Sequence, residues 1–508
     1  MNTSENEMKE FVAVQNTEMQ TEKKAPPAYF ESSGEFTLPD YMEPVQKVLR
    51  LESKVLMPTV SRATGEVQMH GSALHSLIYV GQSGEVAATV LPTDYRFAVQ
   101  IENGDAPLSV ELAQTATSYR LLGPRKISIR AKSAAQVSTY PVTDLAPKTA
   151  ADGQDDSICC LYQTVRQRTR RCYDPIELDV DERIDASQDA KPIWCDATAA
   201  VTDIRVHGGE AQIRGDVYAK VLFCVGTRAK MAEKKIRFDA MLPLEDAGVE
   251  GAFAKVQVQS TEVSEEDGAF VVDVSLKLCL CGEGAAEVSV CTDAFSTFAP
   301  TEIERVPICA FEPVILRQGV FSVSGSVPGG AFSDAGRIVD TTGEAKIETV
   351  KAEGGKIKVC GYGEMQAIYE GEGGYGCGSF RLPFEISFDA ADADGCGCYA
   401  DAEVVSAHTR IDGDRLICDA EIALTVFAER RADESAVVSI ALQKDTPYET
   451  AKHPICIVFP KDGESLWSVA KQYRTPPHEI ARENRLRTGA EPMDLPRTWE
   501  APLLISYK

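Results

Sequence analysis

Cysteines are the first residues in this chain to consider for chemistry, because 15 of its 508 residues are cysteine. Cys279 and Cys281 alternate along an apolar stretch and would share one strand face, while Cys377, Cys396 and Cys398 flank glycine-rich sequence. A structural zinc site needs four ligands at workable spacing, and the sequence has no C-x2-C pair. We therefore expect packed or surface thiols, with no metal and no cofactor. The odd count favours a reducing compartment over a disulfide framework.

A run of arginines suggests a second kind of chemistry, the binding of anions. Arg166, Arg168 and Arg170 alternate, with Arg171 beside them, and so line one face of an expected strand. They form either a docking patch for an acidic partner or a solvated face that pairs with the chain's own carboxylates. His75 lies in another strand pattern, and we expect a histidine with its hydrogen bonds satisfied there rather than a catalytic base.

Motifs for catalysis are missing from the sequence. It contains no Gly-x-Ser-x-Gly elbow, no phosphate-binding Gly-x4-Gly-Lys-Ser/Thr loop and no His-Glu-x2-His. We therefore expect a protein that is not an enzyme. The enzyme alternative would require a pocket in one part of the chain that gathers titratable groups missing from its siblings.

The elements that position these residues follow a pattern that occurs three times. Stretches flanked by two glycines begin at Gly65, Gly209 and Gly355, which are 144 and 146 residues apart. Apolar residues alternate with polar ones in each stretch, and again in a later stretch that begins with Phe97, Phe238 or Phe384. This period of two is typical of strands with one face in a core. We expect a mainly β fold with three repeated antiparallel sandwich-like or barrel-like domains.

Composition limits the partners of the chain. The formal net charge is −25, which disfavours nucleic acid and anionic membranes. No stretch approaches the roughly 20 apolar residues of a membrane span, and the N-terminus does not read as a secretory signal. We expect no membrane insertion and a cytoplasmic location. We predict a disordered lead at residues 1–27 and three β repeats at 28–150, 151–300 and 301–442. A linker at 443–452 and a small C-terminal module at 453–508 follow.

The C-terminal module changes from strand to helical periodicity. A short strand at 455–459 precedes a turn, a first helix capped by Ser465, a second helix introduced by Thr475 and Pro476, and a closing strand at 502–505. Trp467 is either a core residue of this small unit or the edge of a binding surface. Asn484 either bonds backbone groups at the helix end or contacts a ligand.

This strand–helix–helix–strand order resembles a LysM module, through the glycine-containing turn, the Ser465–Ala470 stretch, Tyr473, and the second helix that ends in Asn484 and Leu486. The resemblance implies a binding surface formed by the first turn, the start of the first helix and the loop after the second helix. The turn reads Asp-Gly where the family usually has Gly-Asp, and the link 487–500 is longer than usual. The residues expected on this partner- or glycan-binding surface are Asp462, Gly463, Glu464, Ser465, Trp467, Asn484 and Leu486.

Three β copies followed by such a module resemble the clostridial spore-coat morphogenesis proteins built from SPOCS domains. The glycine-flanked strands and the leading segment from Phe36 to Val55 carry the resemblance. It implies a scaffold of the mother-cell cytoplasm that acts at the forespore surface, where the LysM module docks onto a coat morphogenetic ATPase. The alternative function is glycan binding, to peptidoglycan of the wall or cortex, through the LysM module.

Overall fold

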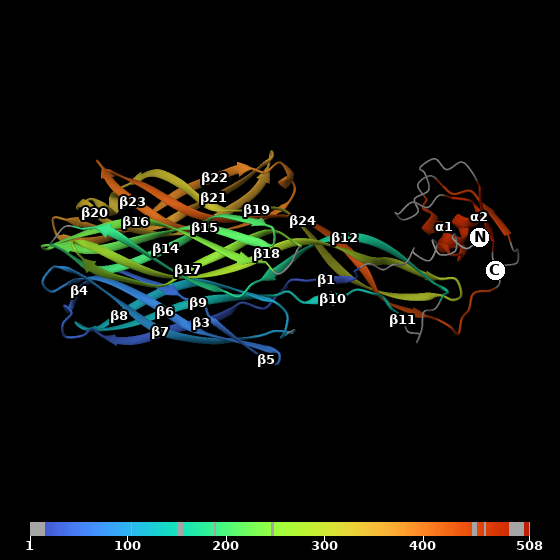
Figure 1. Cartoon of the computed structure of the whole chain (residues 1–508), viewed down its shortest axis with the longest axis horizontal. Coiled ribbons are helices and arrows are strands. Elements are labelled where there is room, and N and C mark those ends of the chain that lie inside the picture. Colours follow the sequence, from blue (N-terminus) through green and yellow to red (C-terminus); the bar gives the residue numbers. More distant parts are fainter. Residues whose placement is uncertain are drawn as a thin grey trace.

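The computed structural model describes residues 16–506, except for 103, 150–155, 187–188, 245–247, 450–454, 462–463 and 487–501. The fold is mainly β and its sheets are largely antiparallel, as the sequence predicted. Sheets build a long body, some strands continue from it as an arm, and two short helices lie in a module beyond the arm (Figure 1). No helix in the described part of the chain is long and apolar enough to cross a bilayer.

The first set of strands forms two facing sheets. In one sheet β6 is central, between β7 on one side and β4 and β5 on the other; in the second sheet β9 is central, between β8 on one side and β2 and β3 on the other. The two sheets share an apolar core that includes Leu77 and Tyr79 of β6 and Ile127 and Ile129 of β9. The strands are β2 (Lys23–Lys24), β3 (Ala28–Thr37), β4 (Val45–Val55), β5 (Thr59–Ala63), β6 (Glu66–Gly81), β7 (Val86–Gln100), β8 (Leu108–Gly123) and β9 (Lys126–Thr139).

The next set repeats this strand order. Strand β15 is central in a sheet with β14 and β16, and β18 is central in a sheet with β12, β13 and β17. Residues of both sheets meet in one large core. The strands are β12 (Ile158–Cys172), β13 (Ile176–Asp185), β14 (Ala190–His207), β15 (Glu210–Val225), β16 (Arg228–Pro243), β17 (Val249–Glu266) and β18 (Ala269–Ser296).

The last set has the same order again. Strand β21 is central between β20 and β22, while β24 is central between β19 and β23 and also receives the short strand β11 in parallel. The elements are β11 (Lys148–Thr149), β19 (Thr301–Pro328), β20 (Ala335–Glu353), β21 (Lys356–Gly371), β22 (Gly374–Asp389), β23 (Gly397–Asp412) and β24 (Arg415–Leu442), with 3-10 turns at Gly330–Phe332 and Ala391–Ala393.

The glycines that mark the sequence pattern have two physical roles. Gly65, Gly209 and Gly355 have positive φ, between 71° and 80°, in the turns that begin the central strands. The second glycine of each stretch lies under an aromatic ring of the neighbouring strand. A Cβ there would lie within 2.8 Å of a ring atom in all three cases. The opposed pairs are Gly71 with Tyr95, Gly215 with Phe238 and Gly361 with Phe384.

A buried ion triad lies where the three sets of strands meet. The Asp340 side chain, on β20, is fully buried, and its carboxylate lies 2.5 Å from Nη1 of Arg50 and 3.2 Å from Nζ of Lys220. Arg50 belongs to β4 and Lys220 to β15, so each set supplies one charge. Burial alone would raise the pKa of Asp340, but the charges of Arg50 and Lys220 hold it well below its usual range.

Apolar residues extend this junction. The guanidinium carbon of Arg50 lies 5.7 Å from the Trp194 ring centroid, and Trp194 belongs to a core shared by all three sets. The three sets are therefore packed against one another through a common interior. The residues of this shared core are Leu49, Ile78, Val80, Val86, Ala88, Trp194, Leu222, Ala229, Val339, Ile368 and Tyr375.

The arginine run forms a second internal charge cluster, at the base of the arm. Arg170 Nε lies 2.6 Å from Oε1 of Glu283, and Arg168 Nη1 lies 2.7 Å from Oε2 of Glu429. Arg170 also donates a 2.9 Å hydrogen bond to the Tyr140 hydroxyl. Of the two interpretations of this run, pairing with the chain's own carboxylates therefore holds for Arg168 and Arg170, whose side chains are largely buried.

The arm consists of two antiparallel ribbons. Strand β12 pairs with the end of β18, and the start of β19 pairs with the end of β24. Side chains of both ribbons pack together around Cys291, Ala294, Val437 and Ile440. The 28-residue strands β18, β19 and β24 run from the body into the arm, so continuous strands join the body to the arm.

The N-terminal segment differs from the prediction of a disordered lead over residues 1–27. Strand β1 (Glu18–Gln20) pairs with β10 (Val142–Asp144), and β2 pairs with β9. Met19 is fully buried in a cluster with Leu145, Val165 and Ile308. The partners lie more than a hundred residues away, so local periodicity gave no sign of them. Residues 1–15 lie outside the described part of the chain.

His75 is a buried residue of β6 with both ring nitrogens engaged. The Ser53 hydroxyl lies 2.6 Å from Nδ1 and the Thr93 hydroxyl 2.8 Å from Nε2. Burial lowers the pKa of His75 to about 4. The imidazole therefore stays neutral in the folded protein near pH 6, where the unfolded chain already takes up a proton.

We expect the His75→Gln variant to have a flatter dependence of stability on pH than the wild type. In the wild type, the contribution of His75 to the free energy of unfolding is complete above the unfolded-state pKa of about 6.5. It is lost as the pH falls towards about 4, because only the unfolded chain binds the proton in this range. Urea unfolding across this range measures the slope. The variant His207→Gln, at an exposed histidine that ends β14, serves as the control for a substitution on the surface. Equal slopes in His75→Gln and the wild type would contradict the assignment.

Candidate binding site on the C-terminal module

The C-terminal module is a strand, two helices and a strand. Strands β25 (Ile455–Val458) and β26 (Leu503–Ser506) pair antiparallel, and α1 (Leu466–Tyr473) and α2 (Pro477–Glu483) connect them. Ser465 caps α1, because its hydroxyl accepts a 3.1 Å hydrogen bond from the Ser468 amide. The second helix begins one residue later than the sequence predicted: Pro476 is the N-cap and Pro477 the first helical residue.

The apolar face of α1 builds the core of the module. Val469 and Ala470 are fully buried, together with Ile480 of α2 and Leu503 and Ile505 of β26. The same cluster includes Phe295 of β18 and, more peripherally, Cys159 and Leu161 of β12. The module is therefore packed directly onto the tip of the arm.

Trp467 lies in this contact with the arm. Only 8% of the residue is exposed, and its ring meets Phe295 edge-on with the centroids 5.0 Å apart. The indole Nε1 donates a 3.0 Å hydrogen bond to Oδ2 of Asp293. Of the two interpretations of Trp467, the structure favours the buried one, with the addition that the tryptophan packs on the arm as well as inside the module.

Asp293 of β18 is the polar centre of the same contact. Its carboxylate lies 2.6 Å from Nζ of Lys471 on α1 and 3.0 Å from Nη2 of Arg305 on β19. Burial alone would raise the pKa of Asp293, but the hydrogen bonds from Lys471 and Trp467 keep it below its usual value. Two cations and an indole N–H, from α1 and β19, thus converge on one carboxylate.

The other predicted surface residues mostly have structural roles. The Asn484 side chain exchanges two 2.7 Å hydrogen bonds with the backbone of Leu504, so it joins the end of α2 to β26. Glu464 Oε2 accepts a 2.9 Å bond from the Lys461 amide, and Leu486 packs at the edge of the module core. Asp462 and Gly463 lie outside the described residues.

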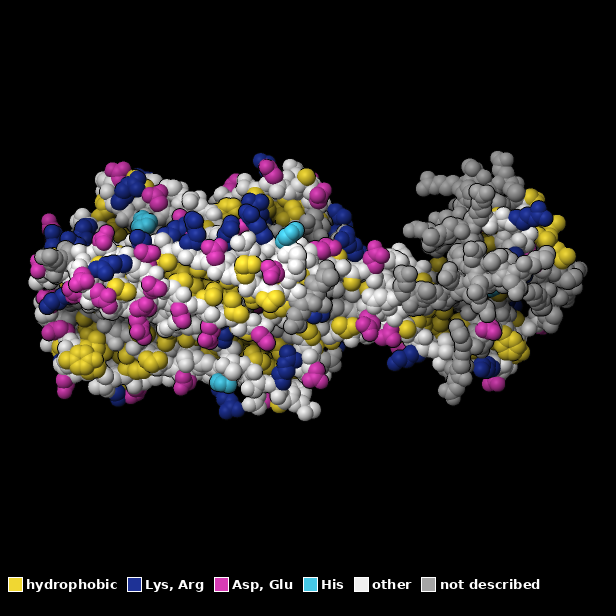
Figure 2. All heavy atoms as spheres, in the orientation of Figure 1, with side chains coloured by type: hydrophobic (Ala, Val, Ile, Leu, Met, Phe, Trp, Pro, Cys, Tyr) yellow, Lys and Arg dark blue, Asp and Glu magenta, His cyan; other side chains and the backbone are white. Residues whose placement is uncertain are grey.

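The exposed surface of the module is an apolar strand face that the predicted site did not include. Ile455 is 56% exposed and Ile457 63% exposed, and Phe459 after the strand is 70% exposed. Leu504 of β26 is also exposed. Alternation explains the pattern, because Val458 points into the core while Ile455 and Ile457 point away from it. We call Ile455, Ile457, Phe459 and Leu504 the outer apolar face; apolar side chains are visible on the outer rim of the module in Figure 2.

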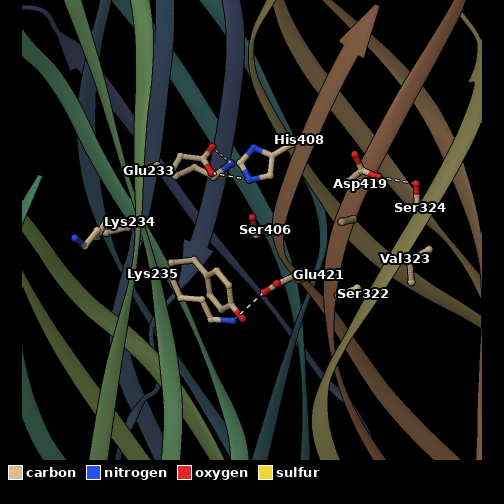
Figure 3. A pocket seen from close by; sticks show the side chains of 14 residues that line it. Glu233, Lys234, Lys235, Ser322, Val323, Ser324, Ser406, His408, Asp419 and Glu421 are labelled. Carbon is tan, nitrogen blue, oxygen red and sulfur yellow. Dashed lines mark hydrogen bonds and ion pairs between the residues drawn. The ribbon is translucent and has the colours of Figure 1, made fainter. Parts of the chain in front are cut away.

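A cleft between the second and third sets of strands has a different character. Its volume is about 480 Å³, and polar side chains of β15, β16, β19, β23 and β24 line it. Its acids already have partners: Glu233 lies 3.1 Å from the His408 ring, Glu421 lies 3.3 Å from Lys235, and Asp419 accepts a 2.5 Å hydrogen bond from Ser324 (Figure 3). The first two pairs connect the two sets across the cleft, and the third lies within the third set.

Charge on the visible face of the body is mixed. Figure 2 shows Lys and Arg side chains interspersed with Asp and Glu, without one large region of a single sign on this face. Among the described residues, no group of three or more His, Cys, Asp and Glu side chains is arranged to hold a metal ion. The outer apolar face is thus the feature of the module best suited to binding another molecule.

Comparisons with known proteins add no further constraint. No protein-family model, no curated protein and no solved structure matches this chain.

Proposed function

We propose that this chain is a non-enzymatic scaffold in spore-coat assembly, in which three SPOCS-like β repeats form the body and a LysM-like module recruits a coat morphogenetic ATPase. In this proposal it acts in the mother-cell cytoplasm at the forespore surface. The three sets of strands with one common strand order and the strand–helix–helix–strand module support the resemblance from which this proposal comes.

The observation that carries the proposal is the outer apolar face of the module, which packs on the tip of the arm. Ile455, Ile457 and Phe459 expose a contiguous stretch of apolar side chains, while the charges at the two internal junctions are used for pairing within the chain. Exposed apolar side chains on a small two-stranded sheet are suited to a protein partner, which can add apolar contacts and backbone hydrogen bonds. The three sets of strands share a core, and the module that carries this face packs on the arm that extends from them.

The position of Trp467 favours a protein partner over a glycan. Sugar recognition by the LysM surface would draw on Trp467, but its ring is buried against Phe295 and its N–H is bonded to Asp293. Asn484 is likewise occupied by the Leu504 backbone. Glycan binding remains the alternative outcome of the tests below.

We expect Ile457→Asp to abolish capture of the coat ATPase by the full-length chain from extracts of sporulating cells. The substitution places a charge in the centre of the outer apolar face, and the exposed side chain contributes little to the module core. Affinity capture followed by quantitative mass spectrometry measures the recovered partner. The matched control is Met241→Asp on β16, because Met241 is 65% exposed and lies in the body.

Two results would count against this proposal. Equal recovery of the ATPase with Ile457→Asp would remove the outer apolar face as the binding surface. Failure of the wild-type chain to recover any coat protein would remove the scaffold function itself.

A further inference from the structure

Two cysteines face each other across neighbouring strands at the base of the arm. Cys172 of β12 is the register partner of Cys281 of β18, and their sulfur atoms lie 3.4 Å apart. The Tyr173 amide donates a 3.0 Å hydrogen bond to the Leu280 carbonyl, which makes Cys172 and Cys281 a pair without hydrogen bonds between their own backbones. Such pairs have the closest side chains in an antiparallel ladder, with Cα atoms about 4.5 Å apart, within the range a disulfide spans.

The surroundings favour reaction at one of the two sulfurs. The Cys281 thiol donates a hydrogen bond to the Cys172 sulfur, which lowers the pKa of Cys172 although burial opposes the effect, while the nearby Arg170 guanidinium acts in the same direction on both thiols. The same contact and burial raise the pKa of Cys281. Both residues are half-buried. We therefore assign Cys172 as the attacking thiol and Cys281 as the resolving thiol.

We propose that Cys172 and Cys281 are a modification site at which a low-molecular-weight disulfide introduces a reversible cross-strand disulfide. The Cys172 thiolate attacks one sulfur of the oxidant, and a thiolate leaves. The Cys281 thiol then loses its proton and attacks the Cys172 sulfur, which releases the second small thiol. Two protein thiols are oxidised to one disulfide, and one small disulfide is reduced to two thiols.

The bond would strengthen a junction that already holds the arm to the body. The next pair on the same strand face is Arg170 with Glu283, which belongs to the internal charge cluster at the base of the arm. A covalent link there closes a loop of about 110 residues that includes much of the second set of strands. Oxidation is therefore expected to raise the resistance of this set to unfolding.

The test uses the folded full-length chain and oxidised glutathione. We expect the free-thiol count to fall by two, a Cys172–Cys281 peptide to appear in non-reducing digests, and the thermal midpoint to rise by several degrees and return with dithiothreitol. Cys281→Ser should stop at a mixed disulfide on Cys172, and Cys172→Ser should leave Cys281 largely unmodified. The control Cys360→Ser, which replaces a half-buried cysteine of β21 whose strand partners are Thr349 and Glu385, should react as the wild type does.

Three results would overturn the proposal. They are no reaction at either thiol while the chain is folded, separate glutathione adducts on both cysteines without a link, and a link from Cys172 to Cys279 instead of Cys281. Circular dichroism of the two serine variants distinguishes a loss of reactivity from a loss of fold.

Discussion

Replacing Asp340 by asparagine is expected to lower the free energy of unfolding by about 3–5 kcal/mol. The substitution keeps the shape of the side chain but leaves Arg50 and Lys220 buried without the carboxylate that lies between them. Because the two cations belong to the first and second sets of strands, we expect the loss to weaken the packing of all three sets together. Denaturant unfolding monitored by tryptophan fluorescence measures it, since Trp194 lies beside Arg50.

The control for this prediction is Asp239→Asn. Asp239 pairs with Arg214 at 3.0 Å, but both side chains are well exposed, so the cost should stay below about 1 kcal/mol. Asp340 also makes stability depend on pH, because its pKa is lower in the folded protein than in the unfolded chain. The ionised carboxylate stabilises the fold above the usual aspartate pKa, and this stabilisation is lost as the pH falls below about 4. Unchanged unfolding of Asp340→Asn would show that the triad does not hold the three sets together.

Trp467→Ala is expected to destabilise the module and its attachment to the arm, by about 3–5 kcal/mol for a large buried aromatic residue. The alanine leaves the space beside Phe295 unfilled and removes the hydrogen-bond donor to Asp293. Hydrogen exchange should become faster in α1 and α2 while the body keeps its protection, because the body has its own cores. The measurement is hydrogen exchange of the full-length chain by mass spectrometry.

Asp293→Ala separates attachment from folding of the module. This variant changes the arm alone and leaves Lys471, Arg305 and the Trp467 N–H without their common acceptor. We expect the apolar core of the module to persist while its contact with the arm loosens. If hydrogen exchange in the module and the overall dimensions in solution stay as in the wild type, the carboxylate does not fix the module.

The alternation of apolar and polar residues predicted the strands well, because it determines which side chains of a strand are buried. Val67, Met69, Ala211, Ile213, Ile357 and Val359 are all fully buried, as their period of two indicated. The paired glycines also had a local cause, in positive φ at the turn and an aromatic ring across the strand.

The buried charge clusters could not be predicted from local sequence patterns, because their residues come from distant parts of the chain. Lys220 and Asp340 are 120 residues apart, and each lies in a strand pattern that predicts nothing of the other. The strand at Met19 was missed for the same reason.

The candidate site was only partly predictable. Ser465 followed from capping rules, and the helical face around Val469 followed from its spacing. The role of Trp467 depends on Asp293, which lies 174 residues earlier, so the sequence left its two interpretations open. The outer apolar face was within reach, because alternation over 455–459 requires that one side of the strand faces away from the core.

Direct titration of the purified full-length chain with the purified coat morphogenetic ATPase tests the central proposal, with sedimentation on peptidoglycan sacculi in parallel. The proposed scaffold function predicts saturable binding to the ATPase that Ile457→Asp abolishes and Met241→Asp preserves, and no saturable binding to sacculi. Absence of ATPase binding, or saturable binding to sacculi that Ile457→Asp leaves unchanged, would contradict it.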